Sequence, residues 1–211
     1  MKGDEPTVYL VDDDLSVREG VTDLLSSVGL HVEAFGSPQE FLDRKRPDAL
    51  GCLILDVRVP GPSGLEFQRL LANSEIHLPI IFISAHGDIA MSVRAIKSGA
   101  IEFLTKPFRH QELLDAINIG IERDRAQRGE AAQVAELRKR HSALTQRERE
   151  IMALVIVGRV NKQIAADLEI SEATVKVHRG QIMRKMQAQS LPELVHMGDA
   201  LKLAGPKPPQ G

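Results

Sequence analysis

The stretch Thr7-Val8-Tyr9-Leu10-Val11-Asp12-Asp13-Asp14 carries the pattern that governs the first half of the chain: a run of strand-forming residues that ends in carboxylates. Stretches with helical spacing separate this run from four similar ones; Val17, Val21 and Leu24, for example, fall on one helical face. The later runs are His31–Phe35, Cys52–Leu55, Ile80–Ser84 and Ile101–Leu104. Nearly continuous apolar strands that alternate with helices predict an α/β fold, a parallel (βα)5 sheet with helices on both faces.

Local signals in this half mark where helices begin. Ser37 to Glu40 has the spacing of a capping box, with Pro38 at the first helical position. Asp14 is expected to cap the helix that follows it rather than to bind a ligand. The helical spacing of the first helix extends to Val28, which falls on the same face as Val17 and Val21.

The composition describes a globular protein of 211 residues, of which 43% are apolar, and this length suits two small domains. No apolar run approaches the about 18 residues that a membrane span needs. The first residues do not resemble a secretory signal, and the single cysteine, Cys52, excludes a disulfide framework. We therefore expect a cytoplasmic protein with no membrane partner.

Charged and aromatic residues are unevenly distributed. Residues 1–121 carry 11 basic and 18 acidic side chains, whereas residues 144–211 carry 10 basic and 7 acidic ones. All the aromatic residues lie in the first half. The basic excess suggests that the second half binds a polyanion, and the lack of aromatic side chains there disfavours recognition of single strands by base stacking.

Polar residues stand where the predicted strands end. Asp12 and Asp13 follow the first strand, Asp56 follows the third, Ser84 closes the fourth and Lys106 follows the fifth. Each alone could be a turn or cap residue, but ligands of parallel sheets bind at this edge. Clustered carboxylates repel, so either one of them is protonated or a cation such as Mg²⁺ (or Mn²⁺) lies between them. A carboxylate can also attack phosphorus while a lysine and a hydroxyl hold the phosphoryl oxygens. The set therefore predicts an aspartate phosphorylation site with its metal cradle.

Rival phosphate chemistry lacks its sequence signals. The chain has no GxxxxGK[ST] motif and no EF-hand pattern. Phosphatases of the haloacid dehalogenase type need a second aspartate two residues after the nucleophile, and Arg58 occupies that position. We therefore expect that the protein is not an enzyme with sustained phosphatase turnover.

Four motifs in this order resemble the receiver domain of bacterial two-component response regulators. They are Asp12-Asp13, Asp56-Val-Arg-Val-Pro-Gly-Pro-Ser-Gly64, Ser84-Ala-His-Gly87 and Lys106-Pro-Phe108. The resemblance covers about residues 5–122 and implies a flavodoxin-like strand order 2-1-3-4-5.

The resemblance also implies roles for these residues. Asp56 accepts the phosphoryl group from a phosphohistidine of a sensor histidine kinase. Asp13, Asp56 and the backbone carbonyl of Arg58 ligate the metal, and Asp12 contributes through water. Ser84 and Lys106 contact the phosphoryl group.

Two further positions concern the response to phosphorylation. Phe103 occupies the position of the switch aromatic residue, whose ring follows Ser84 inward. Val59 departs from the usual methionine, and we expect only a packing effect.

The segment after the predicted sheet lacks proline and is rich in helix formers. Its apolar stripe fades after Ile121, so we expect a long fifth helix that runs from a receiver domain (1–123) into a helical linker (124–143). Gly129 is the expected interruption, and disorder from about residue 126 is the alternative.

The second half predicts a small all-α domain at 144–203, followed by a flexible tail at 204–211. Thr145 and Glu148 form a capping box, and Ser171 caps a later helix that reaches about Met186. Helices at Asn161–Leu168 and Leu191–Leu203 complete a helix-turn-helix arrangement, which is also compatible with any small helical bundle.

The residues Leu144-Thr-Gln-Arg-Glu-Arg-Glu-Ile151, Asn161-Lys-Gln-Ile-Ala165, Ser171-Glu-Ala-Thr-Val-Lys-Val-His-Arg179 and Ile182-Met-Arg-Lys-Met186 resemble the LuxR/NarL-type DNA-binding domain. With the receiver, the chain resembles the FixJ/NarL family. Val175 and Ile182 are expected in the core, and Gly180 departs from the longer side chains that are frequent there. The candidate base readers are Thr174, Lys176, Val177 and Arg179, and the candidate phosphate contacts are Asn161, Lys162, Arg184 and Lys185.

The resemblance implies a transcription factor that binds double-stranded promoter DNA when phosphorylated. Dimerisation through the fourth helix and fifth strand, at about residues 89–106, is implied as well, with RNA polymerase as a further partner and activation as the expected outcome. The alternatives are an aspartyl phosphatase with a helical module, and a constitutive DNA-binding protein whose receiver serves only protein contacts.

Overall fold

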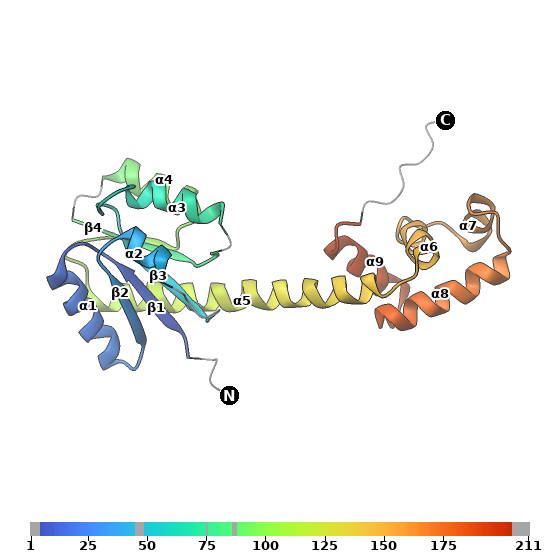
Figure 1. Ribbon diagram of the computed structural model, residues 1–211, viewed down its shortest axis with the longest axis horizontal. Coiled ribbons are helices and arrows are strands. Elements are labelled where there is room, and N and C mark those ends of the chain that lie inside the picture. The colour runs from blue at the N-terminus through green and yellow to red at the C-terminus, as the bar shows by residue number, and fades with distance from the viewer. Residues whose placement is uncertain (1–4, 45–48, 75, 86–87, 204–211) are drawn as a thin grey trace. The chain divides into compact units, whose positions relative to one another are not determined.

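The computed structural model describes residues 5–44, 49–74, 76–85 and 88–203 (Figure 1). The chain separates into two compact units, residues 1–128 and residues 129–211. The predicted tail at 204–211 lies outside the described residues. Within the described part of the chain, no helix is both long and apolar enough to span a membrane.

A parallel sheet forms the centre of the first unit (Figure 1). Its strands are β1 (Thr7–Val11), β2 (His31–Phe35), β3 (Gly51–Asp56), β4 (Ile80–Ser84) and β5 (Glu102–Thr105). They are hydrogen-bonded in the order β2-β1-β3-β4-β5, with Val11 paired with Phe35 on one side and Leu55 on the other. The (βα)5 prediction and the expected strand order are therefore confirmed.

Helices cover both faces of this sheet because successive strand residues point to opposite sides. The helices are α1 (Leu15–Ser27), α2 (Pro38–Asp43), α3 (Gly64–Ala72), α4 (Ile89–Lys97) and α5 (His110–Ser142). Val8 and Leu10 of β1 pack toward α1 and α5, whereas Tyr9 and Val11 pack toward Phe41 of α2 and the helices α3 and α4.

The ends of α1 and α2 follow the local sequence signals, with one difference at Glu40 and one at Val28. Asp14 caps α1, because its carboxylate accepts a hydrogen bond from the Ser16 amide at 2.8 Å. Ser37 caps α2, but the Glu40 carboxylate accepts from the Gly36 amide at 2.8 Å instead of completing the capping box. Val28 is 52% exposed, since α1 has already ended and this residue forms its cap.

Helix α5 is continuous through residues 124–142, so this segment is helical as expected, and the alternative of disorder from about residue 126 is not observed. Gly129 does not interrupt it, contrary to expectation. Ion pairs between Asp124 and Arg128 and between Glu136 and Arg140, each four residues apart, stabilise the turns on either side.

The part of α5 that belongs to the first unit packs against the start of β3 and is hydrogen-bonded to it. Asp124 is only 2% exposed; its carboxylate accepts from the Gly51 amide at 2.9 Å and from Arg128 at 2.8 Å. A Cβ at Gly120 would lie 3.0 Å from the Cβ of Cys52, so glycine permits the close approach of helix and strand.

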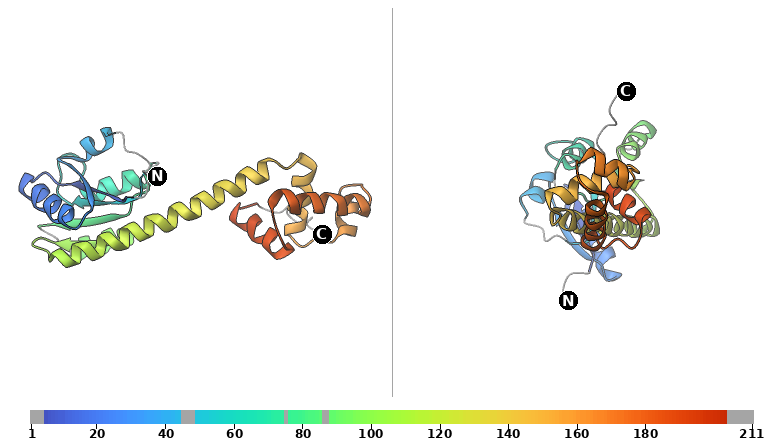
Figure 2. Two further views of the ribbon diagram at one scale, coloured as in Figure 1. Left: turned by 90° about the horizontal axis from the view of Figure 1, so that it is seen from below. Right: turned by 90° about the vertical axis from the view of Figure 1, so that its right-hand side faces the viewer.

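The second unit is a helical bundle built around one core (Figure 2). Its own helices are α6 (Gln146–Ile156), α7 (Asn161–Asp167), α8 (Glu172–Met186) and α9 (Leu191–Ala200). Val175 and Ile182 are fully buried as predicted, and the Thr145–Glu148 capping box is present. Helix α9 ends three residues before the expected Leu203, and Lys202 adopts a left-handed φ of 52° just beyond it. The all-α helix-turn-helix prediction is confirmed.

Candidate functional site

The carboxyl ends of β1, β3 and β4 bring the predicted polar residues to one edge of the sheet. Asp12 and Ser84 are fully buried and Asp56 is 6% exposed, whereas Asp13 faces solvent. Carboxylate oxygens of Asp12, Asp13 and Asp56 lie within 4.8 Å of one another. Three carboxylates this close repel one another unless a cation lies among them.

Lys106 supplies such a cation from the segment after β5. Its Nζ donates to Asp12 Oδ2 and to Asp56 Oδ2, each at 2.6 Å. The Lys106 amide donates to the Ser84 carbonyl at 2.8 Å, which fixes this segment beside β4. Burial lowers the pKa of Lys106, but the bonds to Asp12 and Asp56 outweigh it and raise the pKa above its ordinary value. Burial raises the pKa of Asp12 despite the neighbouring ammonium group.

Both carboxylate oxygens of Asp56 accept hydrogen bonds. The Arg58 amide donates to Asp56 Oδ1 at 2.8 Å, while Oδ2 faces Lys106. Gly64 makes this turn possible, because a Cβ there would lie 2.5 Å from the Asp56 carbonyl oxygen. The glycine that ends the motif at residues 56–64 is therefore a steric requirement of the site.

Arg18 is a site residue that the sequence reasoning missed. From α1 its Nη1 donates to the Asp12 carbonyl at 2.6 Å, which ties the helix to the loop that carries Asp12 and Asp13. The only sequence signal was that Arg18, a long cationic side chain, directly follows Val17 in the first turn of the helix after the acidic residues.

The residues expected to respond to phosphorylation lie on adjacent strands. Ser84 is the last residue of β4, and Phe103 of β5 pairs with Phe82 in the sheet. The rings of Phe82 and Phe103 are 6.2 Å apart, and Phe103 is partly buried against the core on the α3 and α4 side. Val59 packs against the same core.

The donor set suits a hard divalent cation. Three carboxylates from two strand ends offer oxygen ligands only, which is the preference of Mg²⁺. The Arg58 backbone is adjacent to this cluster, since its amide already contacts Asp56. The arrangement thus combines a buried carboxylate with two groups, Lys106 and Ser84, that can contact the oxygens of an incoming phosphoryl group.

In the second unit, the candidate base readers lie in the first half of α8. Thr174, Lys176 and Val177 are exposed, and the Thr174 hydroxyl is hydrogen-bonded to the Ser171 hydroxyl at 2.8 Å. Arg179 is only partly exposed; its Nη1 donates to Asn161 Oδ1 at 3.0 Å, which joins α8 to the start of α7.

The candidate phosphate contacts divide into exposed and engaged side chains. Lys162 on α7 and Arg184 on α8 are exposed. Lys185 instead donates to Glu148 Oε2 at 2.6 Å, and Glu148 is 3% exposed. The structure thus brings Asn161 and Arg179 together and leaves Lys176, Val177 and Arg184 on an open helix surface.

Known proteins share both parts of this architecture. Residues 8–118 match the response regulator receiver domain family, and residues 142–198 match the luxR family of bacterial regulatory proteins. Nodulation protein W of Bradyrhizobium diazoefficiens is 51% identical over 197 residues, covering 93% of this chain and 87% of that protein.

Solved structures agree with the sequence matches. The low-resolution structure of the response regulator StyR is 50% identical with a TM-score of 0.78, covering 92% of this chain and 98% of that one. Full-length FixJ from B. japonicum is 36% identical with a TM-score of 0.56, covering 95% of this chain and 98% of that one. Since these matches name transcription regulators and extend across both units, the chain belongs to the LuxR/FixJ family of two-component response regulators, with a receiver domain and a LuxR-type DNA-binding domain.

Proposed function

We propose that Asp56 is the phosphoacceptor and that its phosphorylation controls promoter binding by the second unit. An Asp56 carboxylate oxygen attacks the phosphorus of a phosphohistidine on a sensor histidine kinase; the P–N bond breaks and the imidazole leaves. The observation that carries the proposal is the convergence of Asp12, Asp13 and Asp56 around Lys106 Nζ. Lys106 and Ser84 then contact the transferred phosphoryl oxygens.

The metal assignment is part of the same proposal. Asp13, Asp56 and the Arg58 carbonyl would hold Mg²⁺ or Mn²⁺, with Asp12 acting through water. When bound, the ion would supply positive charge that offsets the negative charge of the phosphoryl group. Arg18 keeps the Asp12 carbonyl in place, which positions the first two carboxylates for this role.

A groove beside the site is suited to the kinase. It has a volume of about 290 Å³ and lies between α1 and the segment after β5, with Val17, Gly20, Pro107 and Phe108 among its walls. Lys106 also lines it, so a partner docked here would be next to the acceptor. Gly20→Arg should slow phosphotransfer from a purified sensor kinase but leave phosphorylation by a small phosphodonor unchanged; equal slowing with both donors would contradict this assignment.

The surface of α4 supports dimerisation on phosphorylation. Ile89, Val93 and Ile96 recur at intervals of four and three residues and are 84%, 44% and 44% exposed, beside the edge strand β5. An exposed apolar stripe of this kind is typical of a protein interface. Val93→Glu should abolish phosphodonor-induced dimers in sedimentation experiments, whereas Val28→Glu, at the end of α1, should not. Dimers that persist in Val93→Glu would exclude this face.

In the second unit, we propose that α8 enters the major groove of promoter DNA. Thr174, Lys176, Val177 and Arg179 would face bases, with Asn161, Lys162, Arg184 and Lys185 at phosphates. RNA polymerase would then be a partner in activation, and the cytoplasm is the compartment in which we place the protein. The proposed division is 1–123 for the receiver, 124–143 for the linker, 144–203 for DNA binding and 204–211 for a flexible tail.

The central experiment is a DNA-binding titration of wild type and Asp56→Asn, with and without a small phosphodonor. We expect the phosphodonor to strengthen binding by wild type only. Equal strengthening of both proteins would show that Asp56 does not control binding. If the phosphodonor changes DNA binding by neither protein, although wild type is verified to be phosphorylated, a constitutive DNA-binding protein would be favoured.

A further inference from the structure

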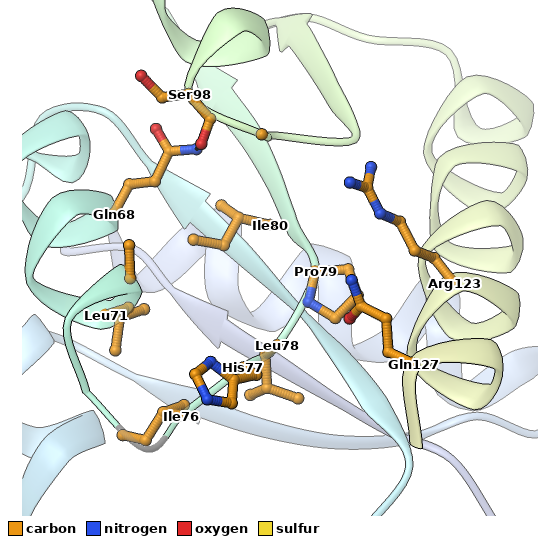
Figure 3. A pocket seen from close by; sticks show the side chains of 12 residues that line it. Gln68, Leu71, Ile76, His77, Leu78, Pro79, Ile80, Ser98, Arg123 and Gln127 are labelled. Atoms are coloured by element: carbon orange, nitrogen blue, oxygen red, sulfur yellow. Dashed lines mark hydrogen bonds between the residues drawn. The ribbon is translucent and has the colours of Figure 1, made fainter. Parts of the chain in front are cut away.

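A second hollow lies at the opposite edge of the sheet from the acidic site. It has a volume of about 180 Å³ and opens where β4 begins, between α3, the connection before β5, and α5 (Figure 3). Because a water molecule occupies about 30 Å³ of liquid, this space suits a small, fragment-sized molecule. None of the residues that the proposed phosphorylation chemistry uses lines it.

The floor of the hollow is apolar and firmly supported. Leu71 of α3 and Ile80 of β4 line it and are 3% and 6% exposed, and both belong to the core on the α3 and α4 side. Ile76, Leu78 and Pro79 continue the same surface (Figure 3). Since these side chains are part of the packed core, the floor cannot collapse to fill the space.

Cationic and amide groups form the rim. Arg123 and Gln127 lie one turn apart on α5, and Gln127 reaches from the helix toward Pro79 (Figure 3). The neighbouring Arg125 and Arg128 form ion pairs with Glu122 and Asp124. Among the described residues, by contrast, the Arg123 guanidinium has no ion-pair partner, and no carboxylate lines the hollow.

A buried amide fixes one wall. Gln68 is 5% exposed, and its Nε2 donates to the carbonyls of Ala95 at 3.4 Å and Ser98 at 3.1 Å. Gln68 Oε1 is buried and has no hydrogen-bond partner in the described structure. A buried acceptor without a partner is uncommon in folded proteins, and the residue that carries it is one of those that line the hollow.

We propose that this hollow binds a small organic carboxylate. The carboxylate would pair with the Arg123 guanidinium and accept from the Gln127 amide, and the apolar body of the molecule would lie on Leu71 and Ile80. The charge complementarity follows from the described lining residues, which include one guanidinium without an ion-pair partner and no acidic side chain. This site is independent of the phosphorylation proposed for Asp56.

Benzoate is a suitable probe, and benzyl alcohol is its uncharged counterpart with the same ring. The full-length, isotope-labelled protein would be titrated with each compound while backbone amide shifts are recorded. Benzoate should shift the amides of Ile80, Ser98, Gly99 and Gln127 with a dissociation constant on the order of millimolar, and benzyl alcohol should bind at least about tenfold more weakly.

Two variants with the same charge change locate the site. Arg123→Gln should weaken benzoate binding by about tenfold, whereas Arg125→Gln, on the same helix outside the hollow, should leave it unchanged. Both positions are exposed, so neither change threatens folding. Binding should also be the same in Asp56→Asn, which separates this proposal from the phosphorylation mechanism. Equal binding of the two compounds, an unaffected Arg123→Gln protein, or shifts confined to other regions would each overturn the proposal.

Discussion

Lys185 Nζ lies 2.6 Å from Glu148 Oε2, so the last turn of α8 is joined to the first turn of α6 across 37 positions of sequence. The same oxygen accepts from the Thr145 amide at 2.7 Å. One carboxylate thus serves both a helix cap and the packing of two helices. The contact holds the C-terminal end of the helix that we assign to the major groove.

Glu148→Gln should lower the unfolding free energy of the second unit by about 1–3 kcal/mol at neutral pH, because a buried pair loses one charge. Burial raises the pKa of Glu148, but Lys185 and the Thr145 bonds outweigh it and bring the pKa below the ordinary 4.5. The folded state therefore binds fewer protons than the unfolded state just below that pH, and the stabilisation present above pH 4.5 is lost on acidification.

Thermal unfolding of the full chain between pH 3 and 7 (roughly the range in which carboxylates titrate) would test this. The difference between wild type and Glu148→Gln should shrink as the pH falls. Glu172→Gln, an exposed change on α8, should show no such convergence. A difference that stays constant with pH would show that the charge of Glu148 is unimportant.

Lys106→Met should tighten Mg²⁺ binding by about 3- to 10-fold, because the ammonium group that contacts Asp12 and Asp56 competes with a divalent ion. Calorimetric titration with Mg²⁺ would measure this. Lys97→Met, an exposed change on α4, is the matched control. Weaker Mg²⁺ binding in Lys106→Met would mean that the lysine holds the carboxylates in position for the ion more than it competes with the ion for them.

Arg18→Lys should lower the unfolding free energy of the first unit by about 0.5–1.5 kcal/mol, because the part-buried Asp12 carbonyl loses its guanidinium donor while the charge is kept. Urea unfolding would measure the loss. Arg69→Lys, on the exposed side of α3, should be neutral. Equal effects of the two changes would exclude a positioning role for Arg18.

Lys176→Ala should weaken binding to a selected operator by about 1–3 kcal/mol and change binding to random DNA little, if Lys176 contacts a base. Arg184→Ala should weaken both and reduce the salt dependence of binding by about one ion. Binding titrations on the two DNAs at several salt concentrations would distinguish these roles. An equal loss on both DNAs in Lys176→Ala would assign that lysine to a phosphate.

Gly180→Ala should stabilise α8 by about 0.5–1 kcal/mol, because alanine favours helix and an added Cβ would meet no described atom within 4 Å. Thermal unfolding would measure the gain. The same substitution at Gly198, where a Cβ would lie 3.1 Å from Ile156, should not stabilise. A loss of stability in Gly180→Ala would contradict an open helix surface at this position.

Local sequence patterns predicted most of the fold. The apolar runs gave all five strands, and short-range signals such as Asp14 and the Thr145–Glu148 box gave helix starts. Helix caps depend on contacts within a few residues, and a buried strand is marked by the apolar run itself, so sequence spacing reveals both. The polar residues that follow the strands were equally informative about the site, because the carboxyl ends of parallel strands all lie at one edge of the sheet.

Contacts between distant residues could not be predicted in this way. The pairing of Lys185 with Glu148 and of Arg18 with the Asp12 carbonyl depends on tertiary packing. Asp124 was expected on a polar connector, yet it is buried because Gly51 and Arg128 satisfy its carboxylate. Gly129 was expected to break the helix, but its cost is only about 1 kcal/mol, and the ion pairs on either side, each worth about 0.2–0.5 kcal/mol, offset part of it.

The environment of Cys52 has a practical consequence. This residue is the only cysteine of the chain, it is fully buried in β3, and burial raises its pKa to about 12. The thiolate is the nucleophile that attacks a maleimide, so the native protein, whose buried thiol stays protonated, should be almost inert toward such reagents. A surface cysteine introduced into each unit would then accept a pair of spectroscopic probes without removal of the natural one, and the separation of the two units could be followed in solution as the phosphodonor is added.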